Sequence, residues 1–282
     1  MHFPTLGGKQ FWTDYVWRDG WRIQRHAIIG HWRLLDNKNR RQAWGSRYRC
    51  NAVLEDRVHE WTSPRSQVVV LLHGLNCTAR SMRGMGRYLA GKLDCEPVYL
   101  EYASMLKLVP DHAMALREVI QGIPKGLPIH FVAHSMGSIV IRRLLGDLGR
   151  DGQTEQLDRI QSIVMLGPPN QGASIARLLS RVGFLPLITG RGGRQLGPSW
   201  NELEPTLAIP HCPFGIVAGA TASPLPNNPL LDGPNDFIVS VQETRLAGAS
   251  DMLLVKCLHN LFMNAREVQE ATLRFIQTNQ FR

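Results

Sequence analysis

The sequence predicts an α/β protein built on a mainly parallel sheet with helices on both of its faces. From residue 67 onwards, short apolar runs typical of strands alternate with longer segments whose apolar residues recur at helical spacing. The first run, Gln67–Leu72, is almost entirely β-branched or aliphatic, as expected for a strand buried on both faces. Because successive parallel strands need a crossover, the intervening helices are expected to cover the two faces of the sheet.

Residues 1–60 precede this alternation and predict a basic, tryptophan-rich extension. Of the formal net charge of +9, most lies in residues 1–50, which hold ten Lys or Arg against three Asp. The chain is expected to be irregular to about Arg25. Two strands, His26–Asp36 and Tyr48–Asp56, are then expected to pair antiparallel at the edge of the main sheet.

Five tryptophans lie among the arginines of this extension: Trp12, Trp17, Trp21, Trp32 and Trp44. Such interleaving is compatible with a surface for nucleic acid or an anionic membrane. It is equally compatible with tryptophans that pack on the main domain while the arginines stay exposed. We favour packing, because a basic patch without a recognised binding module is only an electrostatic footprint. A weak contact with an anionic membrane stays open, and nucleic acid is not the expected partner.

The main domain, residues 61–282, begins with an expected turn at Trp61–Arg65. The expected strands are Gln67–Leu72, Pro97–Tyr102, Ile129–Ala133, Ile160–Leu166, Phe214–Ala218 and Leu253–Cys257. Helices are expected over about Ser81–Leu93, after Asp111, after Gly137 and from Asn264 onwards. The segment Ser174–Pro213 breaks the alternation with apolar clusters and glycines, and it predicts a lid-like insertion; a plain packed helix pair is the alternative.

One junction stands out in this series. The stretch Phe131–Ile139 runs from a strand directly into an amphipathic helix, with Ser135 between them and Gly137 two residues on. A strand turns this sharply into a helix only where the flanking side chains are small, and the turn presents the serine Oγ at a helix N-terminus. Ala133 stands where glycine is commoner in such turns. The junction therefore predicts a nucleophilic serine.

Acyl chemistry by a serine needs a base, an acid that orients the base, and donors for the developing oxyanion. In this topology the acid and the histidine follow the serine in that order. His259 directly follows the last strand and is the candidate base. Asp236 is the preferred acid, with Asp232 as the alternative. A calcium loop at these two aspartates is disfavoured, because two carboxylates supply few of the six to eight oxygens needed.

The expected oxyanion donors are the backbone N–H groups of Met136, after the serine, and Leu75, after the first strand. Cys77 lies near that loop and is expected to be a passive thiol. The five cysteines are scattered, without a CxxC pair, which argues against a disulfide framework or a zinc site. No metal or cofactor is expected. We find neither an apolar run long enough to span a bilayer nor a secretory signal, so a cytoplasmic location is expected.

Five segments in matching order resemble those of α/β-hydrolase lipases and esterases: His73-Gly74-Leu75, Ala133-His134-Ser135-Met136-Gly137, Leu166–Gly172, Gly233–Val241 and Leu258-His259. The resemblance covers about residues 66–282 and does not reach residues 1–60. It implies an α/β-hydrolase fold with Ser135, Asp236 and His259 as the catalytic triad. The chain departs from the family at Asn260-Leu261-Phe262, which leaves the triad intact.

We therefore expect a serine carboxylic-ester hydrolase that acts on a small-molecule ester or a lipid through an acyl-enzyme. A serine acyltransferase or a thioesterase would use the same triad, and a non-catalytic hydrolase-fold binding protein is a further alternative. The apolar loop Met105–Pro110, together with the insertion, suggests a hydrophobic acyl pocket under a cover.

Overall fold

The computed structural model describes residues 9–58, 61–181, 185–220 and 227–282. Its centre is a six-stranded sheet in the order β10-β9-β8-β7-β5-β6, in which all neighbouring strands are parallel. The strands are β5 (Gln67–Leu72), β6 (Cys95–Leu100), β7 (Ile129–His134), β8 (Ile160–Leu166), β9 (Phe214–Gly219) and β10 (Asp251–Val255). The predicted α/β class is thus confirmed, and the predicted strand ends are shifted by at most two residues.

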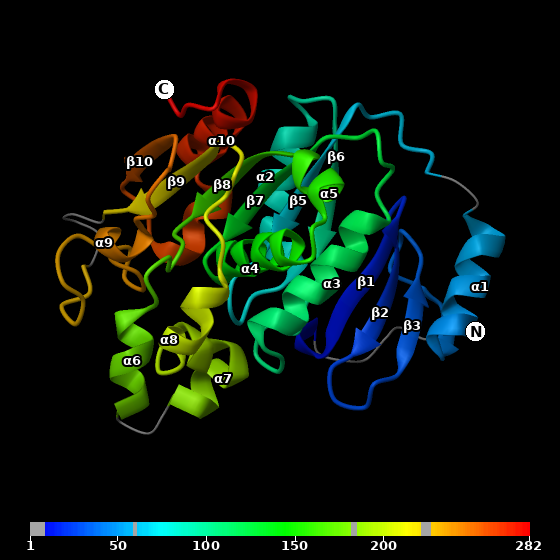
Figure 1. The fold of residues 1–282 in the computed structure, drawn as a ribbon, viewed down its shortest axis with the longest axis horizontal. Helices are drawn as coiled ribbons and strands as arrows, with labels where there is room; N and C mark the ends of the chain where they lie inside the picture. The colour runs from blue at the N-terminus through cyan, green and yellow to red at the C-terminus, as the bar shows by residue number, and fades with distance from the viewer. Residues whose placement is uncertain (1–8, 59–60, 182–184, 221–226) are drawn as a thin grey trace.

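Helices cover both faces of the sheet (Figure 1). On one face lie α3 (Val109–Gln121) and α4 (Met136–Arg150), and on the other lie α2 (Arg83–Ala90) and α10 (Arg266–Thr278). The alternation of side chains along β5 divides the core: Val68, Val70 and Leu72 pack with α3 and α4, whereas Val69 and Leu71 pack with α2 and α10. The short elements are η1 (Lys9–Phe11), η2 (Ala79–Met82), α5 (Thr154–Asp158), α9 (Val241–Thr244) and η4 (His259–Asn264).

The structure of the N-terminal region differs from the prediction. Four antiparallel strands form a separate sheet instead of extending the central one: β1 (Trp12–Arg18), β2 (Trp21–His26), β3 (Trp32–Leu35) and β4 (Arg41–Gly45). The expected irregular stretch therefore contains a hairpin, whose two-residue turn is Asp19-Gly20 with φ values of 48° and 81°. Asp-Gly is a strong hairpin signal, because both turn residues need positive φ. Residues 1–8 lie outside the described residues.

The predicted strand Tyr48–Asp56 is also wrong, because these residues form part of helix α1 (Arg47–Arg57). The Ser46 hydroxyl caps this helix by accepting a hydrogen bond from the Arg49 N–H at 3.2 Å. Cys50 and Leu54, four residues apart, are its buried residues and pack on Ile23 and Leu34 of the small sheet. Their spacing of four residues places both on one face of the helix, toward the small sheet.

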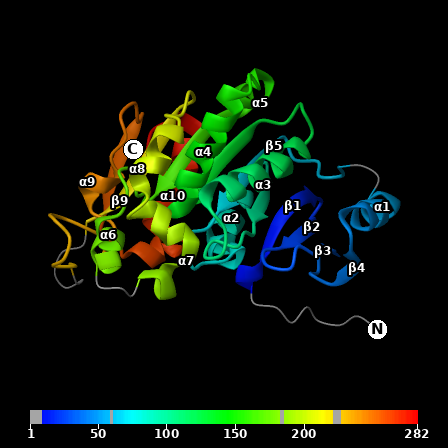
Figure 2. The same cartoon turned by 60° about the horizontal axis from the view of Figure 1, so that its bottom comes forward.

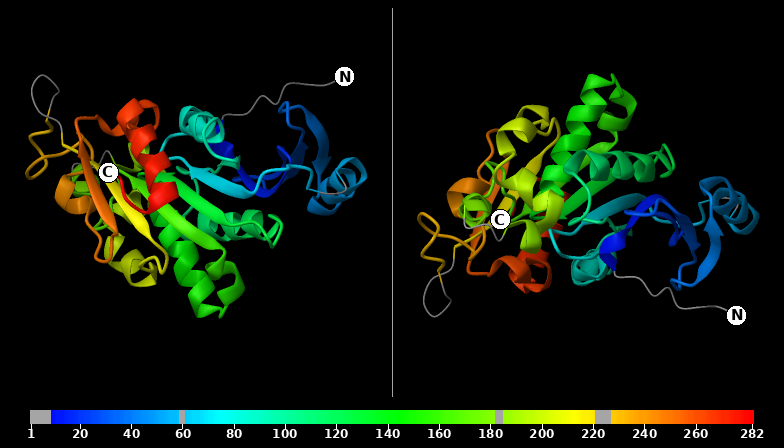
Figure 3. Two further views of the ribbon diagram at one scale, coloured as in Figure 1. Left: turned by 90° about the horizontal axis from the view of Figure 1, so that it is seen from above. Right: turned by 90° about the horizontal axis from the view of Figure 1, so that it is seen from below.

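The small sheet lies beside the β6 edge of the central sheet and beside α3 (Figures 2 and 3). Trp17 is buried and belongs to the main core, and its ring lies 5.3 Å from that of Trp61. The Asp14 N–H donates to the Glu101 carbonyl, just past the end of β6, at 2.9 Å. The Glu101 N–H donates to Oδ2 of Asp14 at 2.7 Å in return, so side-chain packing and several hydrogen bonds join the two sheets.

The segment between β8 and β9 is helical, with α6 (Ser174–Arg181), α7 (Leu185–Leu196), α8 (Trp200–Leu203) and η3 (Glu204–Thr206). Residues 182–184 of the predicted insertion lie outside the described residues. Leu196, Trp200 and Leu203 are buried in the main core, so this segment is packed against the domain. Within the described ranges, no helix has the length and apolarity needed to cross a membrane.

Candidate active site

Ser135 occupies the turn between β7 and α4, where its backbone has φ 52° and ψ −123°. This conformation is costly for a residue other than glycine, and it persists only where the surroundings enforce it. The Ser135 N–H donates to the Leu166 carbonyl of β8 at 2.8 Å. A Cβ on Gly137 would lie 2.9 Å from the His73 carbonyl oxygen, and one on Gly74 would lie 3.1 Å from Cβ of Ser135. The two glycines therefore allow the loop after β5 to lie close to the turn at Ser135.

The sheet order explains why these loops meet. From β5 the chain proceeds to β6 on one side and then returns to β7 on the other, so the direction of winding reverses between β5 and β7. Ligands in open α/β sheets bind at such a switch point, outside the carboxyl ends of the strands. Leu75 follows β5 and Ser135 follows β7, so both predicted contributors lie at this point.

Asp236 and His259 form a buried pair. The Nδ1 atom of His259 lies 2.7 Å from Oδ2 of Asp236, and the His259 N–H donates to the Asp236 carbonyl at 2.9 Å. The other carboxylate oxygen, Oδ1, accepts from the N–H groups of Ile238 at 3.0 Å and Val239 at 2.7 Å. Because an ionised carboxylate only accepts, the imidazole proton lies on Nδ1 and leaves a lone pair on Nε2. The alternative acid, Asp232, is exposed.

Two glycines make room for this pair. A Cβ on Gly167, which has φ +57°, would lie 3.1 Å from both Oδ2 of Asp236 and Nδ1 of His259. A Cβ on Gly219, at the end of β9, would lie 2.5 Å from Cβ of Asp236 and 2.6 Å from the Cys257 carbonyl oxygen. Gly219 was not predicted from the sequence, because a glycine that ends a strand carries no signal of which residue approaches it.

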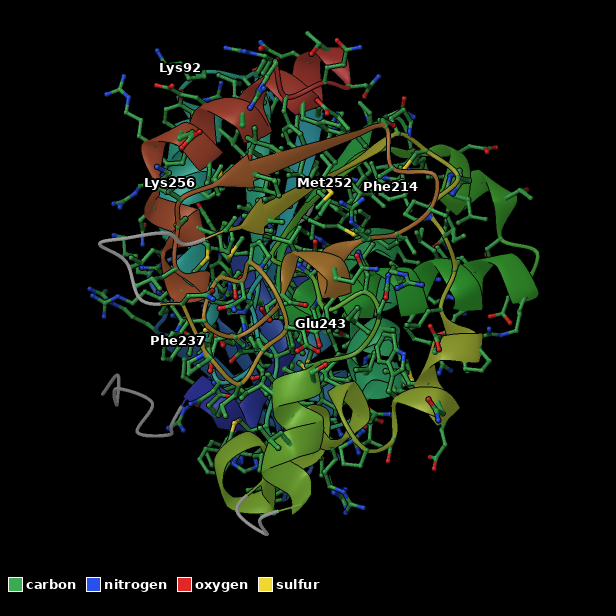
Figure 4. The ribbon with its side chains drawn as sticks, turned by 90° about the vertical axis from the view of Figure 1, so that its left-hand side faces the viewer. Lys92, Phe214, Phe237, Glu243, Met252 and Lys256 are labelled. Carbon is green, nitrogen blue, oxygen red and sulfur yellow. The ribbon has the colours of Figure 1, made fainter. Side chains whose placement is uncertain are left out.

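The loop after Asp236 is fixed by a short helix. Ser240 and Glu243 form a capping box at the start of α9, in which each side chain accepts from the other residue's backbone N–H. Glu243 also accepts from the Ser174 N–H, which connects the loop to α6. In Figure 4 Glu243 lies above the helices of the insertion, whereas Phe237 lies to one side. The Ser-x-x-Glu spacing of Ser240 and Glu243 indicates such a capping box, although it was not among the predicted features.

A cavity of about 250 Å³ brings the predicted residues together. Ser135, His259 and Leu75 line it, and its apolar wall includes Ile175, Ala176, Leu196, Ile238 and Val239. The loop Met105–Pro110, expected to form part of an acyl pocket, does not line this cavity. It lies under α7 instead, where the Arg191 N–H donates to the Met105 carbonyl at 2.8 Å. Within the described residues, the N–H groups of Leu75 and Met136 donate no hydrogen bond.

Two further histidines surround the site and are held neutral. His134 is buried, and its Nε2–H donates to the His259 carbonyl at 2.9 Å. Burial, and then the charge of His259, lower the pKa of His134 well below its usual value. His73 donates from Nδ1 to the Gly74 carbonyl at 2.8 Å, and burial lowers its pKa to about 4. Burial also raises the pKa of the Cys77 thiol, which opposes formation of a thiolate nucleophile.

The parallel sheet, the strand–serine–helix turn and the loops at its carboxyl edge define an α/β-hydrolase fold. No family model matches the chain, and no curated protein matches it in sequence. Solved structures do resemble it. The mature lipase BlEst2 of Bacillus licheniformis has a TM-score of 0.58 at 17% identity, over 77% of this chain and 93% of that protein.

Two other structures share the fold over part of their length. The metagenomic carboxyl esterase MGS0156 has a TM-score of 0.55 at 14% identity, over 70% of this chain and 65% of that one. The phospholipase PlaB of Legionella pneumophila has a TM-score of 0.50 at 18% identity, over 64% of this chain and 45% of that one. Likeness at these identities establishes the fold, whereas function has to be argued from the site.

Proposed function

We propose that this protein is a serine hydrolase of carboxylic esters, with Ser135 as nucleophile, His259 as base and Asp236 as the orienting acid. The observation that carries the proposal is that Ser135 and the Asp236-paired His259 line one apolar cavity. The three residues come from loops after β7, β9 and β10. A nucleophile, a base and an acid that orients the base are the groups that acyl transfer by a serine uses.

The chemistry follows from the proton positions. Asp236 accepts from Nδ1 of His259, so the lone pair on Nε2 is free to take the Ser135 proton as Oγ attacks the ester carbonyl. The oxyanion that forms would be stabilised by the N–H groups of Leu75 and Met136. The imidazolium then protonates the departing alcohol, which leaves an acyl group on Ser135. Water, activated by the same histidine, hydrolyses this ester and restores the enzyme.

The substrate class follows from the cavity. A volume of 250 Å³, at roughly 30 Å³ for a water-sized group, holds about eight such groups. Its apolar lining favours an aliphatic acyl chain of short to medium length. The resembling structures include a lipase, a carboxyl esterase and a phospholipase, which is compatible with an ester or lipid substrate.

A fluorophosphonate probe tests the proposal directly, because it labels only an activated serine. We expect stoichiometric labelling of the folded protein, with the adduct mapped to Ser135 by mass spectrometry. His259→Asn should stop the labelling, and Ser199→Ala, which removes a serine of the insertion outside the cavity, should not change it. A folded protein that the probe leaves unlabelled would instead be a non-catalytic hydrolase-fold protein.

A further inference from the structure

A second cavity, larger than that of the proposed active site, lies away from it. Its volume is about 720 Å³, and it is enclosed by the small N-terminal sheet on one side and by η2, α2 and β6 on the other. We call it the basic cleft, because five arginines and a single glutamate line it: Arg22, Arg33, Arg80, Arg83, Arg87 and Glu101. Among the residues that the structure describes, none lines both this cleft and the active-site cavity.

One wall of the basic cleft consists of three exposed arginines. Arg80, Arg83 and Arg87 lie on η2 and α2 at spacings of three and four residues, which places them on one face of consecutive helical turns. Within the described residues, none of the three side chains makes a hydrogen bond or an ion pair. Three like charges on one face repel one another, so this arrangement is unfavourable unless an anion is present.

The opposite wall holds Arg33 in a fixed position. Arg33 is buried, its guanidinium lies 3.7 Å from the centre of the Trp12 ring, and its Nε donates to Oε1 of Gln24 at 2.8 Å. Gln24 in turn donates to Oδ1 of the buried Asp14 at 2.7 Å. Burial lowers the pKa of Arg33 to about 10, so it still carries its charge at neutral pH. A buried guanidinium oriented by a hydrogen-bond chain is preorganised for binding.

The remaining lining adds aromatic and amide groups. Trp12, Trp17 and Tyr99 supply apolar ring surface, and Asn37 and Asn39 line the cleft beside them. Arg22 donates to the side-chain oxygen of Asn39. Guanidinium groups match phosphate oxygens with paired hydrogen bonds, and the rings would contact the organic part of a ligand.

We propose that the basic cleft binds a phosphate-bearing anion, with two or more phosphate groups, either as a soluble metabolite or as a lipid headgroup. The net positive charge of the lining favours an anion. Because arginines line both walls of the cleft, a ligand with more than one phosphate could pair with each wall. The proposal does not depend on the function of the active site. Its ligand would contact the N-terminal sheet and the hydrolase domain together, and would therefore stabilise their association.

Isothermal titration of the full-length protein with pyrophosphate tests the soluble source. Cosedimentation with phosphatidylcholine vesicles, with and without cardiolipin, tests the headgroup source. The cleft variant is Arg80→Gln/Arg83→Gln/Arg87→Gln. The matched control, Arg49→Gln/Arg57→Gln/Arg266→Gln, removes the same charge from exposed positions outside the cleft. All six arginines are exposed, so both variants should fold, which thermal melts would verify.

We expect the cleft variant to bind its probe at least about tenfold more weakly than the control variant does, since hydrogen bonds between charged groups are lost. Binding of pyrophosphate with this dependence assigns a soluble ligand, and binding of cardiolipin vesicles alone assigns a headgroup. Equal weakening in both variants would show only non-specific charge attraction and would overturn the proposal. Failure to bind either probe, or binding of single-stranded DNA in place of both, would overturn it as well.

Discussion

His259 and Asp236 are joined twice, by the 2.7 Å contact between Nδ1 and Oδ2 and by the 2.9 Å hydrogen bond from the His259 N–H to the Asp236 carbonyl. The second bond links the two loops through their backbones, so the imidazole is positioned by main chain as well as by the carboxylate. Such double support fixes both the tautomer and the ring position before a substrate binds.

Asp236→Asn should leave the fold intact and lower turnover on p-nitrophenyl esters by about 10⁴, by analogy with the serine proteases, because an amide no longer enforces the Nδ1–H tautomer. Asp232→Asn is the matched control, since Asp232 is exposed on the same loop. Steady-state kinetics on the two variants decides between them. If Asp232→Asn lost most of its turnover while Asp236→Asn stayed active, Asp232 would be the orienting acid.

Ser135→Ala and Ser135→Gly should both abolish hydrolysis by several orders of magnitude, since triad members act as a unit. They should differ in stability. Ser135 has φ 52°, a conformation that glycine adopts readily and alanine does not. We expect the glycine variant to be more stable than the alanine variant by about 1 kcal/mol, as measured by urea unfolding. Residual activity within tenfold of the parent would exclude Ser135 as the nucleophile.

Gly219→Ala tests the packing behind the acid. The added Cβ would meet Cβ of Asp236 at 2.5 Å, so the loop has to shift. Overpacking of this kind costs about 1–3 kcal/mol, and the displaced carboxylate should lower turnover as well. Gly149→Ala, on α4, is the control because no atom lies within 4 Å of its new Cβ. Its stability should rise by up to about 1 kcal/mol, with unchanged kinetics. Equal behaviour of the two variants would contradict this account.

The central sheet was predictable because its strands are mostly buried and largely apolar, so local pattern and tertiary packing point to the same structure. The turn at Ser135 was predictable for a similar reason, since a strand, small residues and an amphipathic helix follow one another directly. Asp236 and His259 were predicted as acid and base from chain order. The structure brings the two side chains together, and their catalytic roles stay a prediction.

The N-terminal region was harder, because its apolar residues are interspersed with arginines and form no long run. Cys50 and Leu54 have helical spacing, but Tyr48 and Val53 nearby also suit a strand, and burial by the small sheet decides between them. The basic cleft could not be predicted from the sequence, since Arg33 and Arg80 are distant in the chain. They line one cleft only because the N-terminal sheet packs beside the central sheet.

Acyl-chain selectivity tests the cavity. We expect kcat/KM to rise about fourfold per methylene from acetate, at roughly 0.8 kcal/mol each, until the cavity is filled near a medium chain. Ala176 lines the cavity, so Ala176→Leu should shift the optimum to shorter chains. Ala52→Leu, on the exposed side of α1, is the control and should leave the profile unchanged. A flat profile from acetate to decanoate would contradict the assignment of the cavity to the acyl group.

The last prediction concerns stability below neutral pH. Burial lowers the pKa of His73 and His130 to about 4, that of His112 to about 3, and that of His134 well below its usual value. In the unfolded chain these groups titrate near 6.5. Between about pH 4 and 6.5 the unfolded state therefore binds more protons than the folded state, so stability falls as the pH is lowered through this range.

Each of these histidines contributes a slope of up to about 1.4 kcal/mol per pH unit. The ring of His112 packs on that of Tyr102 at a centroid distance of 4.7 Å. His112→Phe removes one of these titrating groups while keeping an aromatic ring. The free energy of unfolding of His112→Phe should depend less steeply on pH than that of the parent, by up to this amount per unit. Urea unfolding at pH 5.0, 5.5 and 6.0 measures both slopes. Identical slopes would show that His112 takes up no proton on unfolding and is charged in the folded protein.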